Sequence, residues 1–434
     1  MTRLLLIGIN YAPEATGIAP YTAALAEHLS GCGYAVTVVT GMPHYPAWRI
    51  DDAYRGRLRA REVRGAVDVR RRWHHVPRSP SIAGRGLYEA AFMATGLSSL
   101  LLPAPDAVIG VTPSLGGAVL ARVAAKRFGA PYGVVVQDVV SGAVEQSGVG
   151  GRGLARAVAA LEGWAMREAS VAGVVAEGFR PRLEAIGVDS ARIRRLRNWT
   201  RGLPATLDRA AVRARLGWPQ NALVCLHAGN MGKKQGLEQI IECARLAAGS
   251  APRLLFALVG DGNERARIEG LAARSGLANV RLSQLQPEEL FASVLAAADV
   301  LLINQRASLA DASLPSKLTS YVAAGRPVVA AAAAGSETAR EVEASGSGVV
   351  VAPEDPAALL AALLRVTSDA ALAARLGEAG ARHARDVLSK EAALRGYEQF
   401  VAAVLASGGR GRIHAAGSPL PGSLDIGGKG RRAA

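Results

Sequence analysis

The sequence has few cysteines, few aromatic residues and no long apolar run. Its 434 residues include three cysteines, and Cys32, Cys225 and Cys243 lie too far apart for the paired spacing of a zinc site or for a disulfide framework. This usage predicts a reduced, cytoplasmic protein. No apolar stretch reaches the length of about 18 residues that a membrane-spanning helix needs, and the first apolar run passes into a polar loop too early for a signal peptide.

Aromatic residues make up 5% of the chain and do not alternate with basic residues as base-stacking platforms would, so nucleic acid is not an expected partner. The formal net charge is nevertheless +15. Part of this excess is local, because ten arginines from Arg55 to Arg85 face only Glu62 and Asp68. Either this is a solvated surface, or it meets an anionic membrane or a polyprenyl phosphate. The neighbouring segment 88–102 is either a core helix or a shallow membrane-interface segment.

Short apolar runs alternate with longer amphipathic stretches, which predicts parallel strands joined by helices. The pattern begins at Leu4–Ile9, breaks near residue 198 and restarts at Leu223–Ala228. We therefore predict an α/β protein with two Rossmann-like, doubly wound parallel-sheet domains facing each other across a ligand-binding cleft. The predicted ranges are 1–197 for the first domain, 198–215 for a linker, 216–390 for the second domain, 391–406 for a C-terminal helix that can cross back, and 407–434 for a disordered basic tail.

The first loop of interest in the second domain spans residues 226–237. It places Gly232, Lys233 and Lys234 between a strand and the start of a helix. Glycine lets backbone amides approach an anion closely, the helix start offers free N–H groups, and the lysines supply positive charge. The alternative is an ordinary helix-opening loop with solvated lysines.

Two further loops follow in the same domain. Residues 259–264 form a tight turn, although its Asp261 also suits an ordinary turn or cap position. Residues 314–330 begin a helix whose first turn carries Lys317, so that the positive helix end and the lysine can act on the same anion. Three such loops in order predict a diphosphate site rather than three unrelated polar surfaces.

The order Gly-Asn-x-Gly, Val-Gly-Asp-Gly-x-Glu-Arg, Ala-Ala-Asp-Val and Pro-Ser-Lys-Leu, followed by Ala-Gly-Arg-Pro-Val-Val, resembles family 4 glycosyltransferases of the GT-B fold. The opening stretch 8–18, with Met42–Trp48 behind it, is similar to the colanic acid biosynthesis glycosyltransferases of that family. The resemblance covers about residues 3 to 400. It implies an acceptor-side first domain, a donor-binding second domain, transfer from a nucleotide-diphosphate sugar with retention, and no obligatory metal or other cofactor.

The resemblance also implies roles for individual residues. The backbone of Gly17 would approach the donor diphosphate, and Asp138 would lie beside the transferred sugar, unless it merely caps the next helix. The candidate catalytic residues are Asp138, Lys317 and Glu14. The acceptor-side candidates are Asn10, His44, Tyr45 and Trp48, although His44 is also compatible with an ordinary loop histidine. The donor-binding candidates are Gly17, Asn230, Gly232, Lys233, Lys234, Gly260, Asp261, Asp311, Ser316, Leu318 and Ser320, and no residue is assigned to a metal.

The chain departs from the wider family at the donor site. The usual Arg and Lys for the diphosphate would fall at Asn230 and Gln235, so Lys233, Lys234 and Lys317 would have to supply the positive charge. The usual pair of glutamates eight residues apart would fall at Ala312 and Ser320, which are not acidic. Ser320 could bond a ribose hydroxyl, and Asp311 is the nearest carboxylate for the donor sugar.

The expected function is transfer of a sugar to a lipid-linked sugar or oligosaccharide during the synthesis of an exopolysaccharide, a capsule or another cell-envelope glycan. A polyprenyl-diphosphate-linked acceptor and an anionic membrane surface are the expected partners, at the inner face of the cytoplasmic membrane. The absence of an Asp-x-Asp cluster at a strand end fits a site without an obligatory metal. A GT-B-type sugar-nucleotide epimerase and an inactive polysaccharide-assembly partner are the alternatives.

Overall fold

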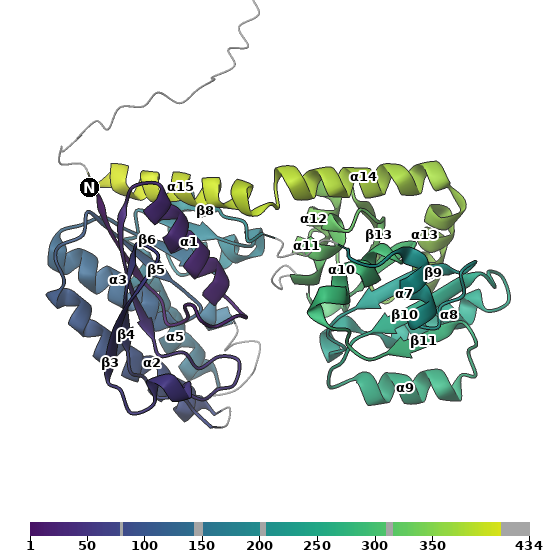
Figure 1. Ribbon diagram of the computed structural model, residues 1–434, viewed down its shortest axis with the longest axis horizontal. Coiled ribbons are helices and arrows are strands. Elements are labelled where there is room, and N and C mark those ends of the chain that lie inside the picture. Colours follow the sequence, from purple (N-terminus) through teal and green to yellow (C-terminus); the bar gives the residue numbers. More distant parts are fainter. Residues whose placement is uncertain (79–80, 143–150, 200–204, 310–315, 409–434) are drawn as a thin grey trace, which may run out of the picture.

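The computed structural model describes residues 1–78, 81–142, 151–199, 205–309 and 316–408, so nearly all of the predicted tail lies outside the described residues. Two domains lie side by side, each built around one sheet (Figure 1). Helices α14 (Ala370–Asp386) and α15 (Lys390–Ser407) run along one edge of both domains. The prediction of two parallel-sheet α/β domains is confirmed.

The N-terminal sheet has the strand order β3-β4-β2-β1-β5-β6-β7-β8. Neighbouring strands pair in parallel, except for the antiparallel pair β3 and β4. Helices cover both faces, which explains why the central strands are almost uniformly apolar. The strands are β1 (Arg3–Ile7), β2 (Ala35–Gly41), β3 (Arg59–Arg64), β4 (Val67–Arg72), β5 (Ala107–Val111), β6 (Tyr132–Val136), β7 (Val171–Val174) and β8 (Ile193–Arg195).

The C-terminal sheet has the order β11-β10-β9-β12-β13-β14, and all its described pairs are parallel. From β9 the chain adds strands toward one edge of the sheet, as far as β11, and then from β12 toward the other edge, as far as β14. The switch point between β9 and β12 opens a crevice at the carboxyl ends of the strands. The strands are β9 (Leu223–Ala228), β10 (Leu254–Val259), β11 (Val280–Ser283), β12 (Val300–Asn304), β13 (Val328–Ala331) and β14 (Gly348–Val351).

Helices pack on both faces of each sheet and close two apolar clusters per domain. Helix α7 (Arg209–Arg215) lies within the predicted linker range 198–215, and it packs against α10 (Glu288–Ala296) of the C-terminal domain. The other helices are α1 (Ala19–Gly31), α2 (Ile82–Gly96), α3 (Leu115–Phe128), α5 (Gly151–Met166), α6 (Arg180–Ala185), α8 (Glu238–Ala247), α9 (Arg265–Arg274), α11 (Ser316–Ala323), α12 (Glu337–Ser345) and α13 (Pro356–Ser368).

Helix α15 returns to the N-terminal domain and packs on β6 and β7. Its Tyr397, Phe400 and Val404 are buried in the same cluster as residues of β1. Gly133 of β6 makes this approach possible, because a Cβ there would lie 2.6 Å from Val404 Cγ2 and 2.7 Å from Phe400 Cζ. The C-terminal helix therefore belongs to the core of the first domain, although the chain reaches it from the second.

The arginine-dense segment forms the β3–β4 hairpin, which the sequence pattern did not reveal. Arg71 is fully buried, contacts the Glu62 carboxylate and the Ala12 carbonyl oxygen, and donates to the Gly41 carbonyl oxygen at 3.3 Å. Arg72 is 9% exposed and donates to Ser98 Oγ at 2.5 Å. Part of the arginine excess is therefore structural, and only the remainder can act as a charged surface.

The segment 88–102 belongs to α2 and to the 3₁₀ helix η2 (Leu97–Leu101), with Tyr88 and Phe92 buried in the core. Its outer side leaves apolar residues in solvent, and Leu101 is 88% exposed. Within the described ranges, no single helix has the length and apolar character to cross a membrane; the bent pair α13 and α14 passes that test only when the two are taken together.

Candidate active site

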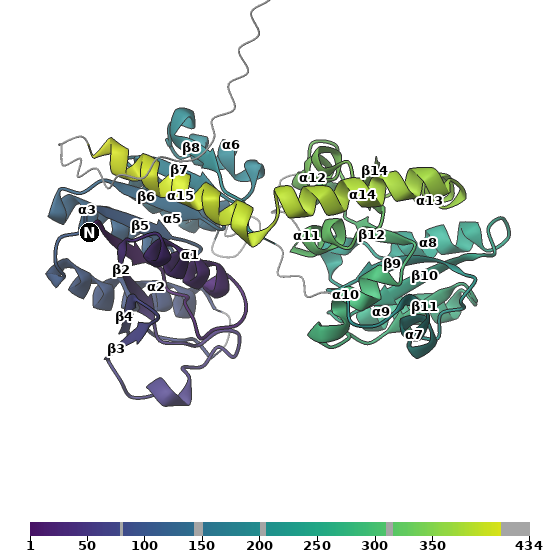
Figure 2. The ribbon, with the colours of Figure 1, turned by 45° about the horizontal axis from the view of Figure 1, so that its top comes forward.

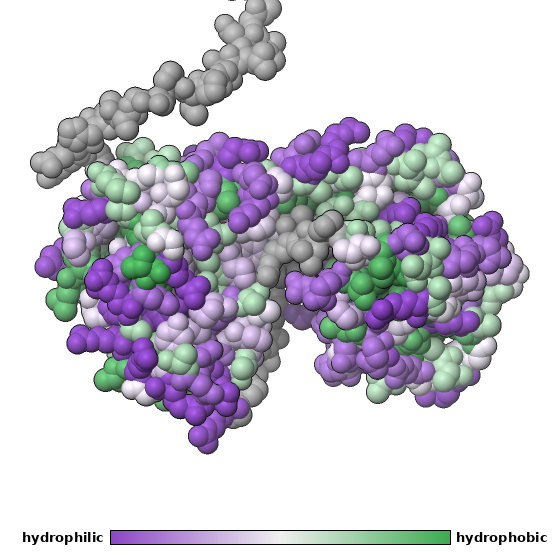
Figure 3. Space-filling view, viewed as in Figure 1, coloured by the Kyte–Doolittle hydropathy of each residue, from purple (hydrophilic) through white to green (hydrophobic). Residues whose placement is uncertain are grey.

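The candidate site lies where the carboxyl ends of the C-terminal strands face the other domain. Helices α11 and α12 lie on the side of their domain that faces the N-terminal domain in both ribbon views (Figures 1 and 2). The space-filling view shows a notch in the surface between the two domains (Figure 3). Loops at the ends of β9 and β10 and the start of α11 bring the candidate donor residues to this side.

Two glycine turns at the ends of β9 and β10 are joined through their backbones. Gly229 N–H donates to the Val259 carbonyl oxygen at 2.8 Å, and Met231 N–H donates to the Asp261 carbonyl oxygen at 2.7 Å. A Cβ on Gly260 would collide with the Gly229 backbone, so glycine is required at this contact. The two turns therefore form one preformed backbone surface.

The turn that carries the two candidate lysines is held by three neighbouring side chains. Gln235 Oε1 accepts a hydrogen bond from Gly232 N–H at 3.0 Å. Asn304 Nδ2 donates to the carbonyl oxygens of Gln235 and Gly236 at 2.7 and 2.9 Å, and Arg306 Nε donates to the Lys233 carbonyl oxygen at 2.9 Å. The side chains of Lys233 and Lys234 remain exposed on this rigid turn. Gln235 thus has a structural role in this turn.

Lys317 lies directly under the first glycine turn. Its Nζ is 3.2 Å from His227 Nε2, and it is 3.8 Å from the place where a Cβ on Gly229 would stand. Burial lowers the pKa of Lys317 to about 8. Burial, followed by the nearby Lys317 charge, holds the pKa of His227 well below its usual value, so the ammonium donates to a neutral imidazole. Tyr321 fixes α11 to β9, because its hydroxyl bonds the N–H and carbonyl of Ala228 at 2.7 and 3.0 Å.

The other donor candidates are placed less directly. Asn230 and Asp261 are exposed, and the Asp261 carboxylate accepts from Gly262 N–H at 2.8 Å. Ser320 is half-buried on α11, whereas the Leu318 side chain is fully buried in the apolar core, which leaves only its backbone for a ligand. Asp311, Ala312 and the side chain of Ser316 lie outside the described residues.

Asp138 follows β6 and approaches the same region from the first domain. Its Oδ1 accepts from Val139 N–H at 2.8 Å, and its carbonyl oxygen accepts from Thr112 Oγ1 at 3.1 Å. Partial burial raises the pKa of Asp138, while the nearby charges of Lys234 and Arg182 oppose that rise. Because Lys234 belongs to the C-terminal domain, its charge acts on this carboxylate of the N-terminal domain.

Glu14 is almost fully buried and is held by hydrogen bonds inside the protein, and it also lines the pocket described below. Its side chain is 2% exposed. Oε1 accepts from the N–H groups of His44 and Tyr45 at 2.9 and 3.0 Å, and Oε2 accepts from Asn10 Nδ2 at 2.9 Å. Burial alone would raise the pKa of Glu14, but its bonds to His44 and Tyr45 outweigh burial and lower it. Glu14 therefore ties the opening loop to the loop 42–48.

A pocket of about 380 Å³ opens beside this junction and supplies a concave surface on the acceptor side. Its lining includes Tyr45 together with the charged residues Arg49, Asp51 and Asp52. Gly17, with φ of +66°, packs against Tyr45, because a Cβ there would lie 3.2 Å from Cε1 of the ring. The opening loop and the pocket wall are thus in contact.

His44 lines the pocket and belongs to a buried aromatic group. Its Nδ1 lies 3.0 Å from the Met42 carbonyl oxygen and its Nε2 lies 3.1 Å from the Tyr88 hydroxyl. The His74 ring packs edge-on at 4.6 Å between centroids, and burial, followed by the neighbouring His44, lowers the pKa of His74 to about 3. Trp48 is 37% exposed, and the Arg85 guanidinium lies 5.5 Å from the centre of its ring. His44 thus lines the pocket while its ring nitrogens contact protein groups, and Trp48 is partly exposed near the pocket-lining residue Tyr45, with 6.1 Å between the two ring centres.

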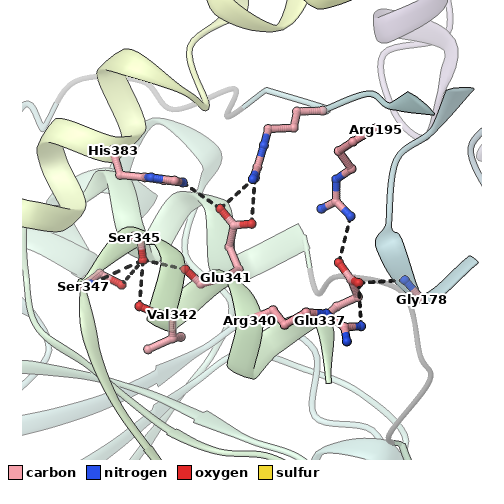
Figure 4. Close-up of polar contacts among 10 residues, drawn as sticks. Gly178, Arg195, Glu337, Arg340, Glu341, Val342, Ser345, Ser347 and His383 are labelled. Carbon is pink, nitrogen blue, oxygen red and sulfur yellow. Dashed lines mark hydrogen bonds and ion pairs between the residues drawn. The ribbon is translucent and has the colours of Figure 1, made fainter. Parts of the chain in front are cut away.

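Sequence reasoning missed the polar network that joins the two domains (Figure 4). Glu337 accepts from Gly178 N–H at 2.7 Å and pairs with Arg195 at 3.1 Å. One turn later on α12, Glu341 pairs with Arg197 at 2.7 Å and with His383 Nε2 at 2.9 Å. Burial opposes ionisation of both glutamates, but the cationic partners outweigh it and lower their pKa values. The available signals were the four-residue spacing of the two acids and, far earlier in the chain, the closely spaced Arg195 and Arg197.

Comparison with known proteins agrees with this architecture. The model of the glycosyl transferase 4-like domain matches residues 16–199, and the model of glycosyl transferases group 1 matches residues 208–383. The chain is 33% identical over 411 residues to "Putative colanic acid biosynthesis glycosyl transferase WcaI" of Escherichia coli K12, covering 92% of this chain and 98% of that protein. It is 34% identical over 217 residues to "D-inositol 3-phosphate glycosyltransferase" of Streptomyces avermitilis, covering 48% and 45% of the two chains.

Solved structures show the same fold at low sequence identity. Sucrose-phosphate synthase of Thermosynechococcus elongatus superposes with a TM-score of 0.68 at 19% identity, covering 94% of this chain and all of that chain. WaaG, a glycosyltransferase involved in lipopolysaccharide biosynthesis, gives a TM-score of 0.57 at 18% identity, covering 90% and 98%. The protein belongs to the family 4 glycosyltransferases of the GT-B fold, so the resemblance, the fold class and the enzyme class expected from the sequence are confirmed.

Proposed function

We propose that this glycosyltransferase moves a sugar, with retention at the anomeric carbon, from a nucleotide-diphosphate sugar to a lipid-linked sugar or oligosaccharide in cell-envelope glycan synthesis. One observation carries the donor half of the proposal: the Lys317 ammonium lies beside the glycine turn at Gly229 and is held there by His227. Relatives support it by their descriptions, since one is named for colanic acid biosynthesis and a structure of Anabaena HepE was solved with UDP-glucose.

The proposed donor site neutralises the charge of a leaving diphosphate. The N–H groups of Gly229, Met231 and Gly232 are already bonded within the protein, so these turns shape the site. The start of α11 would supply N–H groups, and Lys317 would supply an ammonium held by His227. A charged hydrogen bond of this kind contributes about 1.5–3 kcal/mol. Because the lysine and the turns are already positioned before the ligand binds, little reorganisation is needed as the glycosidic bond breaks.

Asp138 and the pocket of the first domain are proposed for the sugar and the acceptor. The Asp138 carboxylate is influenced by the charge of Lys234 in the other domain, and we propose that a sugar transferred between the two domains contacts it. The pocket beside Tyr45 offers an exposed aromatic ring and both signs of charge, a combination that suits a sugar face and its hydroxyl groups. Glu14 acts in this proposal as a positioning residue for the two loops that line the pocket.

We further propose that the first domain rests on an anionic membrane surface that carries the acceptor. Hydrophilic residues gather at the lower end of this domain (Figure 3), which is the end where β3, β4 and α2 are labelled in Figure 1. Leu87, Leu97 and Leu101 on α2 and η2 are 52%, 47% and 88% exposed near this end. Unburied arginines would contribute about 1 kcal/mol each against anionic lipid, and the leucines would enter the interface.

Three experiments test the parts separately. In a thermal-shift screen with UDP-, GDP-, ADP- and dTDP-sugars, one donor class should raise the melting temperature, since a bound ligand stabilises the fold by mass action. Product analysis with that donor should show transfer only when a lipid-linked acceptor is added; conversion of the donor alone would identify an epimerase. In flotation assays with anionic vesicles at low salt, the protein should float and Leu97→Ser/Leu101→Ser should not; flotation independent of lipid charge and of both leucines would refute the membrane proposal.

A further inference from the structure

Three metal-ligating side chains meet outside the donor and acceptor sites, where α15 packs against α1. His28 lies in the last turn of α1 and Cys32 is the cap residue that follows it, so the two stand one helical turn apart. Glu398 reaches them from the middle of α15. One ligand atom from each of the three residues lies within 4.8 Å of the other two. The cluster thus joins two helices that are far apart in the chain, since 366 positions separate Cys32 from Glu398.

The distances suit a tetrahedral ion. Cys32 Sγ is 3.7 Å from His28 Nε2, and His28 Nε2 is 3.3 Å from Glu398 Oε1. Around zinc, with bonds of about 2.3 Å to sulfur and about 2.1 Å to nitrogen or oxygen, ligand atoms stand about 3.4–3.6 Å apart. The third edge, from Cys32 Sγ to Glu398 Oε1, is shorter at 2.7 Å, and along it the thiol donates a hydrogen bond to the carboxylate. Replacing that proton by a cation would open this edge by less than about 1 Å.

We propose that His28, Cys32 and Glu398 form a zinc site that fastens α15 to α1. The thiol proton would leave to solvent, and thiolate, imidazole and carboxylate would supply three ligands, with water in the fourth position because the cluster is open to solvent. A thiolate favours zinc over magnesium or calcium, which prefer oxygen ligands. The other two cysteines, Cys225 and Cys243, are buried in the second domain and cannot offer an equally accessible site.

The position of the site gives it a mechanical role. Helix α15 is the segment by which the chain returns from the second domain to the first, and α1 follows directly after the opening loop that ends at Gly17 and Ile18. An ion between them would hold the returning helix on the first domain while the second domain moves. The site would therefore stabilise the protein without contacting donor or acceptor.

The test uses the full chain, freed of metal with a chelator and titrated with Zn²⁺ alone. We expect one Zn²⁺ per chain, a higher melting temperature with Zn²⁺, and a visible absorption band typical of thiolate-bound tetrahedral Co²⁺ when Co²⁺ replaces it. Cys32→Ser, His28→Gln and Glu398→Gln should each weaken Zn²⁺ binding at least about tenfold. Glu27→Gln, which neutralises an exposed carboxylate on the same helix, is the matched control and should bind as the wild type does.

Two outcomes would overturn the proposal. One is a wild-type protein that binds Zn²⁺ no more tightly than Mg²⁺. The other is that the Cys32→Ser and Glu398→Gln proteins both bind Zn²⁺ with the affinity and stoichiometry of the wild type. Circular dichroism of the metal-free variants checks that each is folded, and the use of two ligands from different helices keeps the test decisive if one variant is not.

Discussion

Replacing Lys317 by methionine should expose a conflict between stability and donor binding. Burial lowers the pKa of Lys317 from 10.5 to about 8. At about 1.4 kcal/mol for each pKa unit, keeping this side chain charged costs the folded state up to about 3 kcal/mol. The unfolded chain holds the proton more tightly than the folded chain does. The wild type should therefore gain stability, relative to Lys317→Met, as pH rises from about 8 to 10.5.

The assay is urea unfolding of the wild type and Lys317→Met at several pH values between 7 and 10.5. Other titrating groups largely cancel in the difference between the two proteins, so its slope reports this one lysine. Lys233→Met, which removes an exposed lysine from the neighbouring turn, serves as the control. A difference that is flat with pH, or that falls as pH rises, would refute the description of Lys317 as a buried cation.

Three further changes test other parts of the site. Glu14→Gln should destabilise the protein by about 1–3 kcal/mol above pH 5, because the ionised carboxylate accepts three hydrogen bonds. The difference in stability should shrink as the pH falls through the lowered pKa of Glu14, and equal urea midpoints at pH 7 would contradict this prediction. Glu341→Gln should cost about 2 kcal/mol, and a double-mutant cycle with Arg197→Gln should show coupling; additive effects would exclude the ion pair. Asp138→Asn should lower the turnover of transfer at least about 100-fold while donor affinity stays within about twofold; unchanged turnover would remove Asp138 from the chemistry.

The strand and glycine-turn pattern of the second domain could be predicted from the sequence. Apolar runs such as Leu223–Ala228 and Leu254–Val259 became β9 and β10, because buried parallel strands need continuous apolar residues. The β3–β4 hairpin could not be predicted in the same way. Its arginines hide the strand pattern, and Arg71 is buried only because Glu62 and backbone carbonyls from other segments receive its guanidinium.

Side-chain direction at the candidate site was beyond sequence reasoning. A motif places Glu14 in the right loop, but only the approach of the loop 42–48 turns its carboxylate inward toward His44. The ion pair of Glu341 with Arg197 depends in the same way on how the two domains meet, and no local pattern records that. Contacts between segments far apart in the chain are therefore where the sequence says least about function.

The central claim is that the glycine turns and Lys317 of the second domain bind the diphosphate of the donor. Titration calorimetry with UDP, GDP, ADP and dTDP tests it most directly, because these ligands present the diphosphate without the sugar or acceptor. One nucleoside diphosphate should bind the wild type, and Lys317→Met should weaken that binding at least about tenfold, as expected for the loss of one charged hydrogen bond. An affinity within about twofold of the wild type in the folded variant would contradict the account.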